Sequence, residues 1–149
     1  MVLAAYPFWG AVATHAGRLL RLQGTAAATH VQRRVREEYG ERETVSRAAR
    51  RVLRSFIDWG VLNETGDKGV YSQGKQYSVE EPRLIAWMVE ASLRSRKSDS
   101  APINEILDSP SIFPFNLMHV NSEHLASISP RLNSLRHGLN ADLVMLRKE

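Results

Sequence analysis

The chain of 149 residues contains no cysteine, so it carries neither a disulfide framework nor a thiolate metal site, and its length fits one domain or one domain with a small appendage. Hydrophobic residues make up 43% of the sequence, which is enough to bury a core. The net charge of +4 is unevenly distributed: residues 1–54 hold ten arginines and four acidic residues, whereas residues 55–149 hold ten basic and twelve acidic residues. A basic balance confined to one third of a chain is typical of proteins that bind polyanions, although a solvated arginine-rich helix face would give the same balance.

The start of the chain and its hydropathy indicate neither export nor membrane insertion. Residues 1–9, MVLAAYPFW, lack the basic start and the long apolar run of a signal peptide. No stretch approaches the ~20 consecutive apolar residues that a membrane-spanning helix needs. Together with the absence of cysteine, this pattern favours a cytoplasmic protein with no membrane partner. Because the first predicted helix begins almost at Met1, the sequence leaves open that the chain is part of a longer protein.

Apolar residues at helical spacing predict two helices in the first forty residues, over 7–23 and 28–39. Pro7 suits a first helical turn, and Gly40 is expected to end the second helix in the left-handed conformation. Phe8 and Trp9 lie at positions that we interpret as core rather than as an aromatic binding site. The buried stripe predicted for the second helix is Ala28, Val31, Val35 and Tyr39.

The strongest helical pattern covers residues 43–59, ETVSRAARRVLRSFIDW. Apolar residues recur along one face at the spacing of a helix, at Val45, Ala49, Val52 and Phe56. The opposite face is predicted to carry Thr44, Ser46, Arg47, Arg50, Arg51 and Arg54. Such a helix can pack against a core on one side and present cations to a partner on the other.

A hairpin of two short strands is predicted directly after this helix, over 61–65 and 69–72. The turn between the strands is Gly66-Asp67-Lys68-Gly69, which has the glycine and aspartate content of tight turns. Lys68 would lie at the tip of the hairpin. Lys75 follows in a second bend that also contains glycine.

The remaining sequence predicts one long helix and several short elements. The long helix begins near Pro82 and ends at residues 94–97, and the polar residues 98–100 are interpreted as a loop or domain boundary. The predicted domains are therefore residues 7–97 and residues 101–149. Within the second, the pattern predicts short helices over 103–107, 122–128 and 130–136, a strand over 115–120, and a helix or a strand over 143–146.

Residues 7–79 resemble the winged helix-turn-helix superfamily. The similarity consists of three helices in the appropriate order, Gly40 before the third helix, and a hairpin that begins at Trp59-Gly60-Val61-Leu62. One departure is that the superfamily usually has a strand before the second helix, where Thr25-Ala26-Ala27 is a poor strand sequence. The resemblance implies a mostly α fold with a small β-hairpin (α+β), to which residues 101–149 add a helical or mixed extension.

The resemblance also implies binding to double-stranded DNA, as a bacterial transcription regulator or a DNA-engaging component of a larger system. In this interpretation residues near the start of the third helix enter the major groove, where arginine can make two hydrogen bonds to guanine. Other cations would hold the phosphate backbone. The predicted DNA-binding residues are Arg33, Arg34, Arg42, Thr44, Ser46, Arg47, Arg50, Arg51, Arg54, Lys68 and Lys75. Four acidic residues near the same surface would neutralise part of this charge: Glu37, Glu38, Glu41 and Glu43.

No motif in the chain predicts an enzyme, a cofactor or a metal site. The five histidines form neither HxxxH nor HExxH, and there is no glycine-rich phosphate loop and no GxSxG elbow. The main alternative is a protein-interaction module on the same scaffold within a multi-subunit assembly. Residues 101–149 would then provide a dimer or partner contact, although Phe113-Pro114-Phe115 is interpreted as core. RNA binding ranks last, because the third helix would fit poorly into the narrow major groove of A-form RNA.

Overall fold

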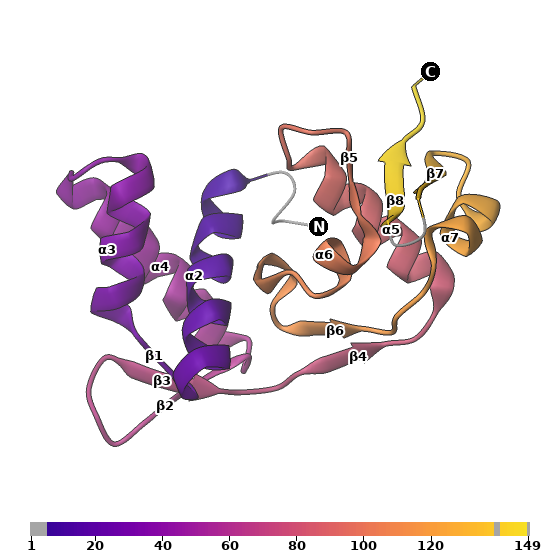
Figure 1. Ribbon diagram of the computed structural model, residues 1–149. Helices are drawn as coiled ribbons and strands as arrows, with labels where there is room; N and C mark the ends of the chain where they lie inside the picture. The colour runs from indigo at the N-terminus through magenta and orange to yellow at the C-terminus, as the bar shows by residue number, and fades with distance from the viewer. Residues whose placement is uncertain (1–5, 139–140, 149) are drawn as a thin grey trace.

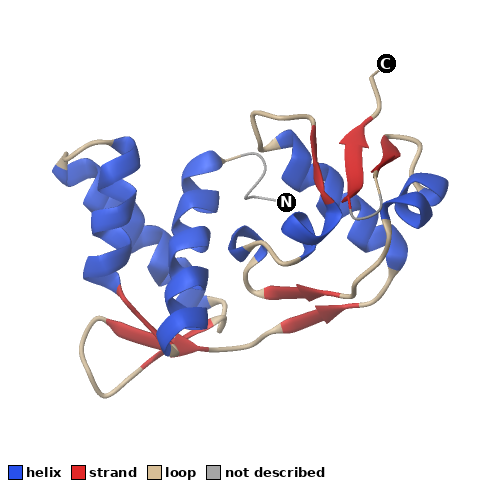
Figure 2. Ribbon diagram, viewed as in Figure 1, coloured by secondary structure: helices blue, strands red, loops and turns tan. Residues whose placement is uncertain are grey.

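The computed structural model describes residues 6–138 and 141–148 and shows two lobes side by side, each with its own hydrophobic core (Figures 1 and 2). The fold combines helices with short strands, so the α+β class expected from the sequence is confirmed. We call residues 6–75 the N-terminal lobe and the described residues after them the C-terminal lobe. The elements of the N-terminal lobe are α2 (Pro7–Gln23), β1 (Thr25–Ala27), α3 (Ala28–Tyr39), α4 (Glu43–Asp58), β2 (Leu62–Glu64) and β3 (Val70–Gln73).

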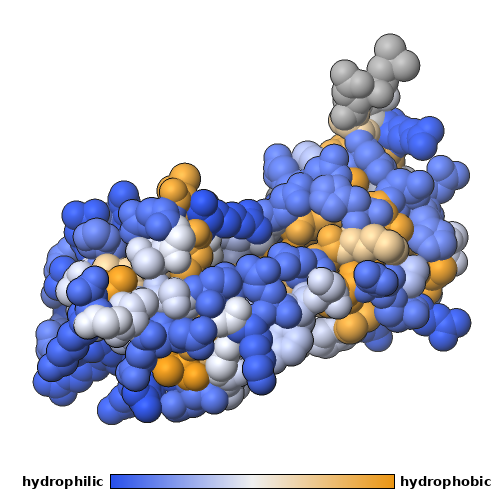
Figure 3. All heavy atoms as spheres, turned by 90° about the horizontal axis from the view of Figure 1, so that it is seen from below, coloured by the Kyte–Doolittle hydropathy of each residue, from blue (hydrophilic) through white to orange (hydrophobic). Residues whose placement is uncertain are grey.

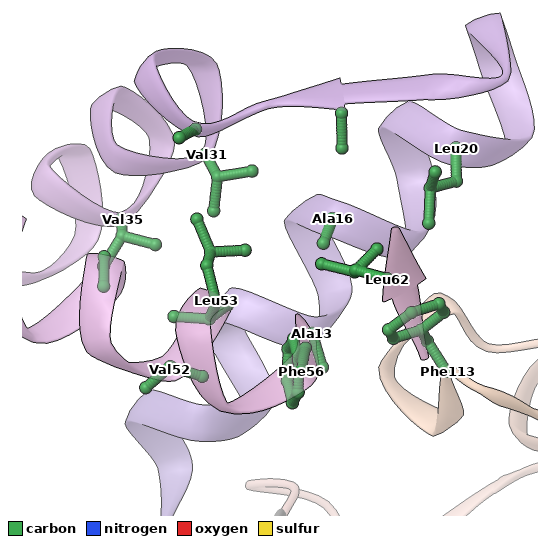
Figure 4. Close-up of a cluster of buried hydrophobic side chains, with 14 of the residues drawn as sticks. Ala13, Ala16, Leu20, Val31, Val35, Val52, Leu53, Phe56, Leu62 and Phe113 are labelled. Carbon is green, nitrogen blue, oxygen red and sulfur yellow. The ribbon is translucent and has the colours of Figure 1, made fainter. Parts of the chain in front are cut away.

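The core of the N-terminal lobe forms where the apolar faces of α2, α3 and α4 meet (Figure 4). Val12, Val31 and Val35 are fully buried there, and Leu53 is nearly so. Within each helix the buried residues recur three or four positions apart, as Val31 and Val35 do in α3 and Ala49 and Leu53 do in α4, which places them on one face of the helix. The amphipathic pattern of the sequence therefore specified both the positions and the facing sides of the three helices.

A three-stranded antiparallel sheet of order β1-β3-β2 closes the N-terminal lobe. Although the sequence of Thr25–Ala27 is poor for a strand, the structure has one there. β1 forms because its three residues pair with β3, with Ala26 opposite Tyr71, and because Ala26 is fully buried. Tertiary pairing thus outweighs the low strand preference of alanine.

The C-terminal lobe has a core of its own, built from one long helix and several short elements. Its elements are β4 (Tyr77–Val79), α5 (Pro82–Arg94), β5 (Ser100–Pro102), α6 (Ile103–Leu107), the 3₁₀ helix η1 (Pro110–Ile112), β6 (Phe115–Leu117), α7 (Ser122–Ile128), β7 (Leu132–His137) and β8 (Ala141–Leu146). β4 and β6 pair in parallel, and β5, β8 and β7 form an antiparallel sheet in that order. The buried side chains of α5 belong to this core, so the helix that the sequence placed in residues 7–97 packs with the elements that follow it.

Several predicted elements of the C-terminal lobe differ from the structure. The helix predicted over 130–136 is wrong, because Leu132–His137 is the strand β7, which pairs along its whole length with β8. The ambiguous stretch over 143–146 is part of β8, while the strand predicted over 115–120 is limited to Phe115–Leu117. These short segments carry too little periodicity to distinguish helix from strand. Whether each forms a strand therefore depends on the strand with which it pairs.

The two lobes meet where η1 and the following residue pack on α2. Phe113 is only 9% exposed and belongs to the core of the N-terminal lobe, where its ring lies edge-on to Phe56 with centroids 5.8 Å apart (Figure 4). Gly17 allows the close approach, because a Cβ atom there would lie 2.8 Å from the carbonyl oxygen of Pro110. The interpretation of Phe113 as core is confirmed.

Candidate nucleic-acid interface

The exposed face of α4 carries most of the predicted DNA-binding residues. Thr44, Arg47, Arg50, Arg51 and Arg54 are all exposed, as the sequence predicted. Ser46 is not, since it is only 4% exposed. Its prediction as a surface residue is wrong, because Ser46 precedes Leu53 by seven residues and so lies on the buried side of the helix. The accessible face is therefore narrower than the sequence indicated.

Carboxylates lie among these arginines and pair with three of them. Glu43 Oε1 is 3.5 Å from Arg47 Nε and 3.2 Å from Arg50 Nη2. Arg54 lies 3.2 Å from Asp58 on α4 and 3.6 Å from Glu64 on β2, so it connects the helix to the hairpin. All of these side chains are more than half exposed, and such ion pairs contribute only about 0–1 kcal/mol. A phosphate group could replace the carboxylates at little cost.

Arg51 lines a groove between α4 and the start of α2. The groove has a volume of about 430 Å³, and its walls are Phe8, Trp9, Thr44, Arg47, Ala48, Arg51 and Val52. Trp9 stacks on Trp59, with ring centroids 5.6 Å apart and planes inclined by 23°. The interpretation of Phe8 and Trp9 as core is confirmed, because both pack against the core cluster. Their position on the groove wall was missed, since the sequence does not show which helix ends meet.

The cations of α3 and of the turn after it lie at the surface. Arg33 and Arg34 are exposed, and Arg34 Nη1 is 3.1 Å from Glu37 on the same helix. Arg42 is exposed and donates a hydrogen bond of 3.5 Å to the carbonyl oxygen of Tyr39. Gly40 has φ 103° and ψ 155°, so the predicted left-handed helical conformation is wrong, although its positive φ still favours glycine.

The hairpin places its two lysines at opposite ends. Lys68 lies in the tip, close to the start of α3, because the amide of Ala28 donates a 2.8 Å hydrogen bond to the carbonyl of Gly69. Lys75 lies at the base, where its amide donates to the carbonyl of Gly60 directly after α4. The two predicted hairpin contacts therefore lie apart, Lys68 near the start of α3 and Lys75 near the end of α4. Within the described residues, no carboxylate lies at ion-pair distance from Arg33, Arg51, Lys68 or Lys75.

Two of the histidines, His15 and His119, each pair with one carboxylate. His15 Nε2 is 2.7 Å from Glu38 Oε1 and joins α2 to α3, whereas His119 Nε2 is 3.0 Å from Asp108 Oδ1 at the surface. In the described part of the chain, no three His, Asp or Glu side chains gather closely enough to hold a metal ion. Nor does any helix there have the length and apolar character required to cross a membrane.

Both lobes expose large apolar side chains. Seen from below, the N-terminal lobe is largely hydrophilic with smaller apolar patches, and broader apolar areas lie over the C-terminal lobe (Figure 3). Exposed large side chains of the C-terminal lobe include Tyr77, Leu84, Trp87, Met118 and Leu135. The N-terminal lobe also exposes Tyr6, Leu22 and Trp59, the last of which directly follows α4.

No model of a protein family, no curated protein and no solved structure gives a significant match to this chain.

Proposed function

We propose that residues 7–79 form a winged helix-turn-helix and that the protein binds double-stranded DNA, as a bacterial transcription regulator or a DNA-engaging component of a larger system. The order of elements supports this proposal: a strand precedes the second helix and pairs with the returning strand of a hairpin after the third. In this scheme α4 is the helix that enters the groove, and the loop between β2 and β3 is the wing.

The observation that carries the proposal is the row of arginines on the exposed face of α4. Arg47, Arg50, Arg51 and Arg54 lie within two helical turns, and the opposite side of the helix is held in the core. An α-helix fits the major groove of B-DNA, and guanidinium groups can bind guanine edges or phosphates there. Lys68 in the wing and Arg33 on α3 would add backbone contacts on either side.

Salt-dependent binding to a mixed-sequence duplex, followed by fluorescence anisotropy, tests this proposal. We expect binding to weaken steeply with salt, because each phosphate contact releases counterions. The double variant Arg47→Ala/Arg51→Ala should lower affinity about tenfold and reduce the salt slope by about 2. Its thermal stability should change little, because each substitution at an exposed position usually costs less than ~0.5 kcal/mol.

The matched control is Arg83→Ala/Arg136→Ala, which removes the same charge from exposed positions of the C-terminal lobe. This control should bind duplex like the unaltered protein. If the two double variants lost equal affinity for duplex DNA, net charge rather than the α4 site would explain the binding. An absence of binding at low salt would overturn the proposal.

A second candidate function is protein binding within a multi-subunit assembly, and the groove beside α4 favours it. Phe8 and Trp9 face Arg47 and Arg51 across this groove, and aromatic residues and arginine are enriched at protein interfaces. Loss of partner capture in Trp9→Ala, with unchanged duplex binding, would support this alternative.

A further inference from the structure

A second basic site lies in the C-terminal lobe, at the end of β8. The site is a cavity of about 600 Å³ lined by Arg94, Asp99, Pro130, Arg131, Leu146, Arg147 and Lys148. These residues come from the end of α5, the residue before β5, the segment before β7, and the last residue of β8 with the two that follow it. The volume falls within the range of about 300–1,000 Å³ that is usual for small-molecule sites.

A buried carboxylate holds two of the arginines in place. Glu90 on α5 is only 8% exposed, and its Oε1 atom lies 2.9 Å from Arg94 Nε and 3.3 Å from Arg131 Nη1. One acceptor thus fixes guanidinium groups from two separate segments. Each guanidinium has five N–H donors, so both retain donors for a ligand, and both side chains are more than half exposed.

Backbone hydrogen bonds fix the rest of the rim. The amide of Arg147 donates 2.8 Å to the carbonyl of Arg131, and the amide of Leu146 donates 2.9 Å to that of Asp99. The side chain of Arg147 is also restrained, because its Nε donates 3.0 Å to Asn133 Oδ1. The guanidinium groups of Arg94, Arg131 and Arg147 are therefore held in place before any ligand arrives, which lowers the entropic cost of binding.

The composition of the C-terminal half does not account for this cluster. Residues 76–149 hold eight basic and nine acidic residues, yet four of the eight basic residues line this one cavity. The described acidic groups of the site are Asp99 on the wall and Glu90 beneath it, so the local balance is positive. Concentrated positive charge in a concave surface attracts small anions more strongly than dispersed charge.

We propose that this cavity binds a small ligand with two or three linked phosphoryl groups. Arginine forks match phosphate oxygens in pairs, and arginines on opposite walls can bind adjacent phosphoryl groups. Pro130 and Leu146 provide apolar surface beside the cations for the remainder of an ester. The site lies at the end of β8, in the other lobe from α4, so it does not depend on the proposed DNA interface (Figure 1).

Isothermal titration with inorganic pyrophosphate, at constant ionic strength and against sulfate, tests the proposal. We expect pyrophosphate to bind at least tenfold more tightly than sulfate. Arg147→Gln/Lys148→Gln should lower that affinity at least tenfold, while Arg83→Gln/Arg136→Gln should leave it unchanged. The first pair leaves Glu90 with both of its arginine partners, so the lobe should keep its fold, which circular dichroism would verify.

Two kinds of result would overturn the proposal. The first is pyrophosphate binding that is no tighter than sulfate binding, or that is equal in the two double variants. The second is displacement of pyrophosphate by duplex DNA together with weaker duplex binding by Arg147→Gln/Lys148→Gln, which would assign the cavity to DNA instead. Retained pyrophosphate binding by Arg47→Ala/Arg51→Ala is expected whether or not α4 binds DNA.

Discussion

At the scale of single residues, the surroundings of Tyr39 change the pKa of its phenol. It lies at the end of α3 with its ring edge-on to Phe8, at a centroid distance of 5.1 Å. Burial raises the pKa of the Tyr39 phenol above its ordinary value of 10.0, and the negative charge of Glu38 raises it further. The folded state therefore holds this proton more tightly than the unfolded state does.

The raised pKa predicts an alkaline loss of stability that depends on Tyr39. The contribution of the protonated Tyr39 phenol to the free energy of unfolding is complete below the ordinary tyrosine pKa. It is lost as pH rises through the raised pKa of the folded state. Tyr39→Phe should thus show a shallower fall of the free energy of unfolding at alkaline pH, measured by urea denaturation from about pH 9 to pH 11.5. The control is Tyr6→Phe, at an exposed tyrosine, and identical pH slopes for the two variants would contradict the prediction.

The residues of α4 show how much of the candidate site follows from sequence. Periodicity placed Arg47, Arg50, Arg51 and Arg54 on the exposed face, because residues three, four and seven positions apart share a side of a helix. It failed for Ser46, which borders the buried stripe and whose small hydroxyl tolerates either side. It also could not show that Glu43, four and seven residues before Arg47 and Arg50, pairs with both. Rotamers rather than spacing decide such contacts.

At the scale of elements, the hairpin depends on one glycine at its base. A Cβ atom on Gly74 would lie 2.7 Å from the backbone carbon of Val61, and the Gly74 amide donates a 3.0 Å hydrogen bond to the Val61 carbonyl. Backbone cannot move aside as a flexible side chain can. Gly74→Ala should therefore destabilise the protein by about 1–3 kcal/mol, measured by urea denaturation.

The comparison for Gly74 is Gly66→Ala in the hairpin tip. A Cβ atom on Gly66 would meet no heavy atom within 4 Å, so this variant should unfold like the unaltered protein. If Gly74 marks a required approach of two backbones, only its variant should lose stability. Equal midpoints for the two variants would show that the hairpin base can open to admit a methyl group.

The sequence predicted the long helices correctly, but it failed for segments whose structure depends on pairing with a distant strand. α2 and α3 were predicted at their observed bounds because each shows an apolar stripe over three or more turns. β1, β4 and β5 have only three residues each, and β7 was predicted to be helical. Such short strands exist through hydrogen bonds to partners far along the chain, as in the pairing of β4 with β6, and no local pattern encodes those partners.

At the scale of the whole molecule, two cores share one junction. The core of the N-terminal lobe receives Phe113 from the C-terminal half of the chain, while the C-terminal core contains Val79 and the buried side of α5. The sharing is one-sided, because the first core includes a residue of the C-terminal lobe, whereas the buried residues described in the second core all lie between Val79 and Val144. The arrangement joins the arginines of α4 and the cationic cavity beside β8 in one molecule, with η1 packed on α2 between them.

This junction predicts that Gly17→Ala will uncouple the lobes. Alanine is favoured over glycine in a helix by about 1 kcal/mol, but here its methyl carbon would lie 2.8 Å from the Pro110 carbonyl oxygen and 3.3 Å from Phe113 Cβ. Because the nearer of these atoms is backbone, η1 must move away from α2 and draw Phe113 from the first core.

Trp87 lies in the C-terminal lobe, and Trp9 and Trp59 lie in the N-terminal lobe, so each lobe has a fluorescent reporter. The Trp87→Phe variant reports unfolding of the N-terminal lobe, and the Trp9→Phe/Trp59→Phe variant reports unfolding of the C-terminal lobe. As long as Gly17 is present, the two variants should unfold at the same denaturant concentration, as expected if the lobes unfold cooperatively. Adding Gly17→Ala to each background should separate the two midpoints, whereas Arg18→Ala at the adjacent exposed position should not. Coincident transitions that survive Gly17→Ala would mean that the parallel pairing of β4 with β6 suffices to hold the lobes together.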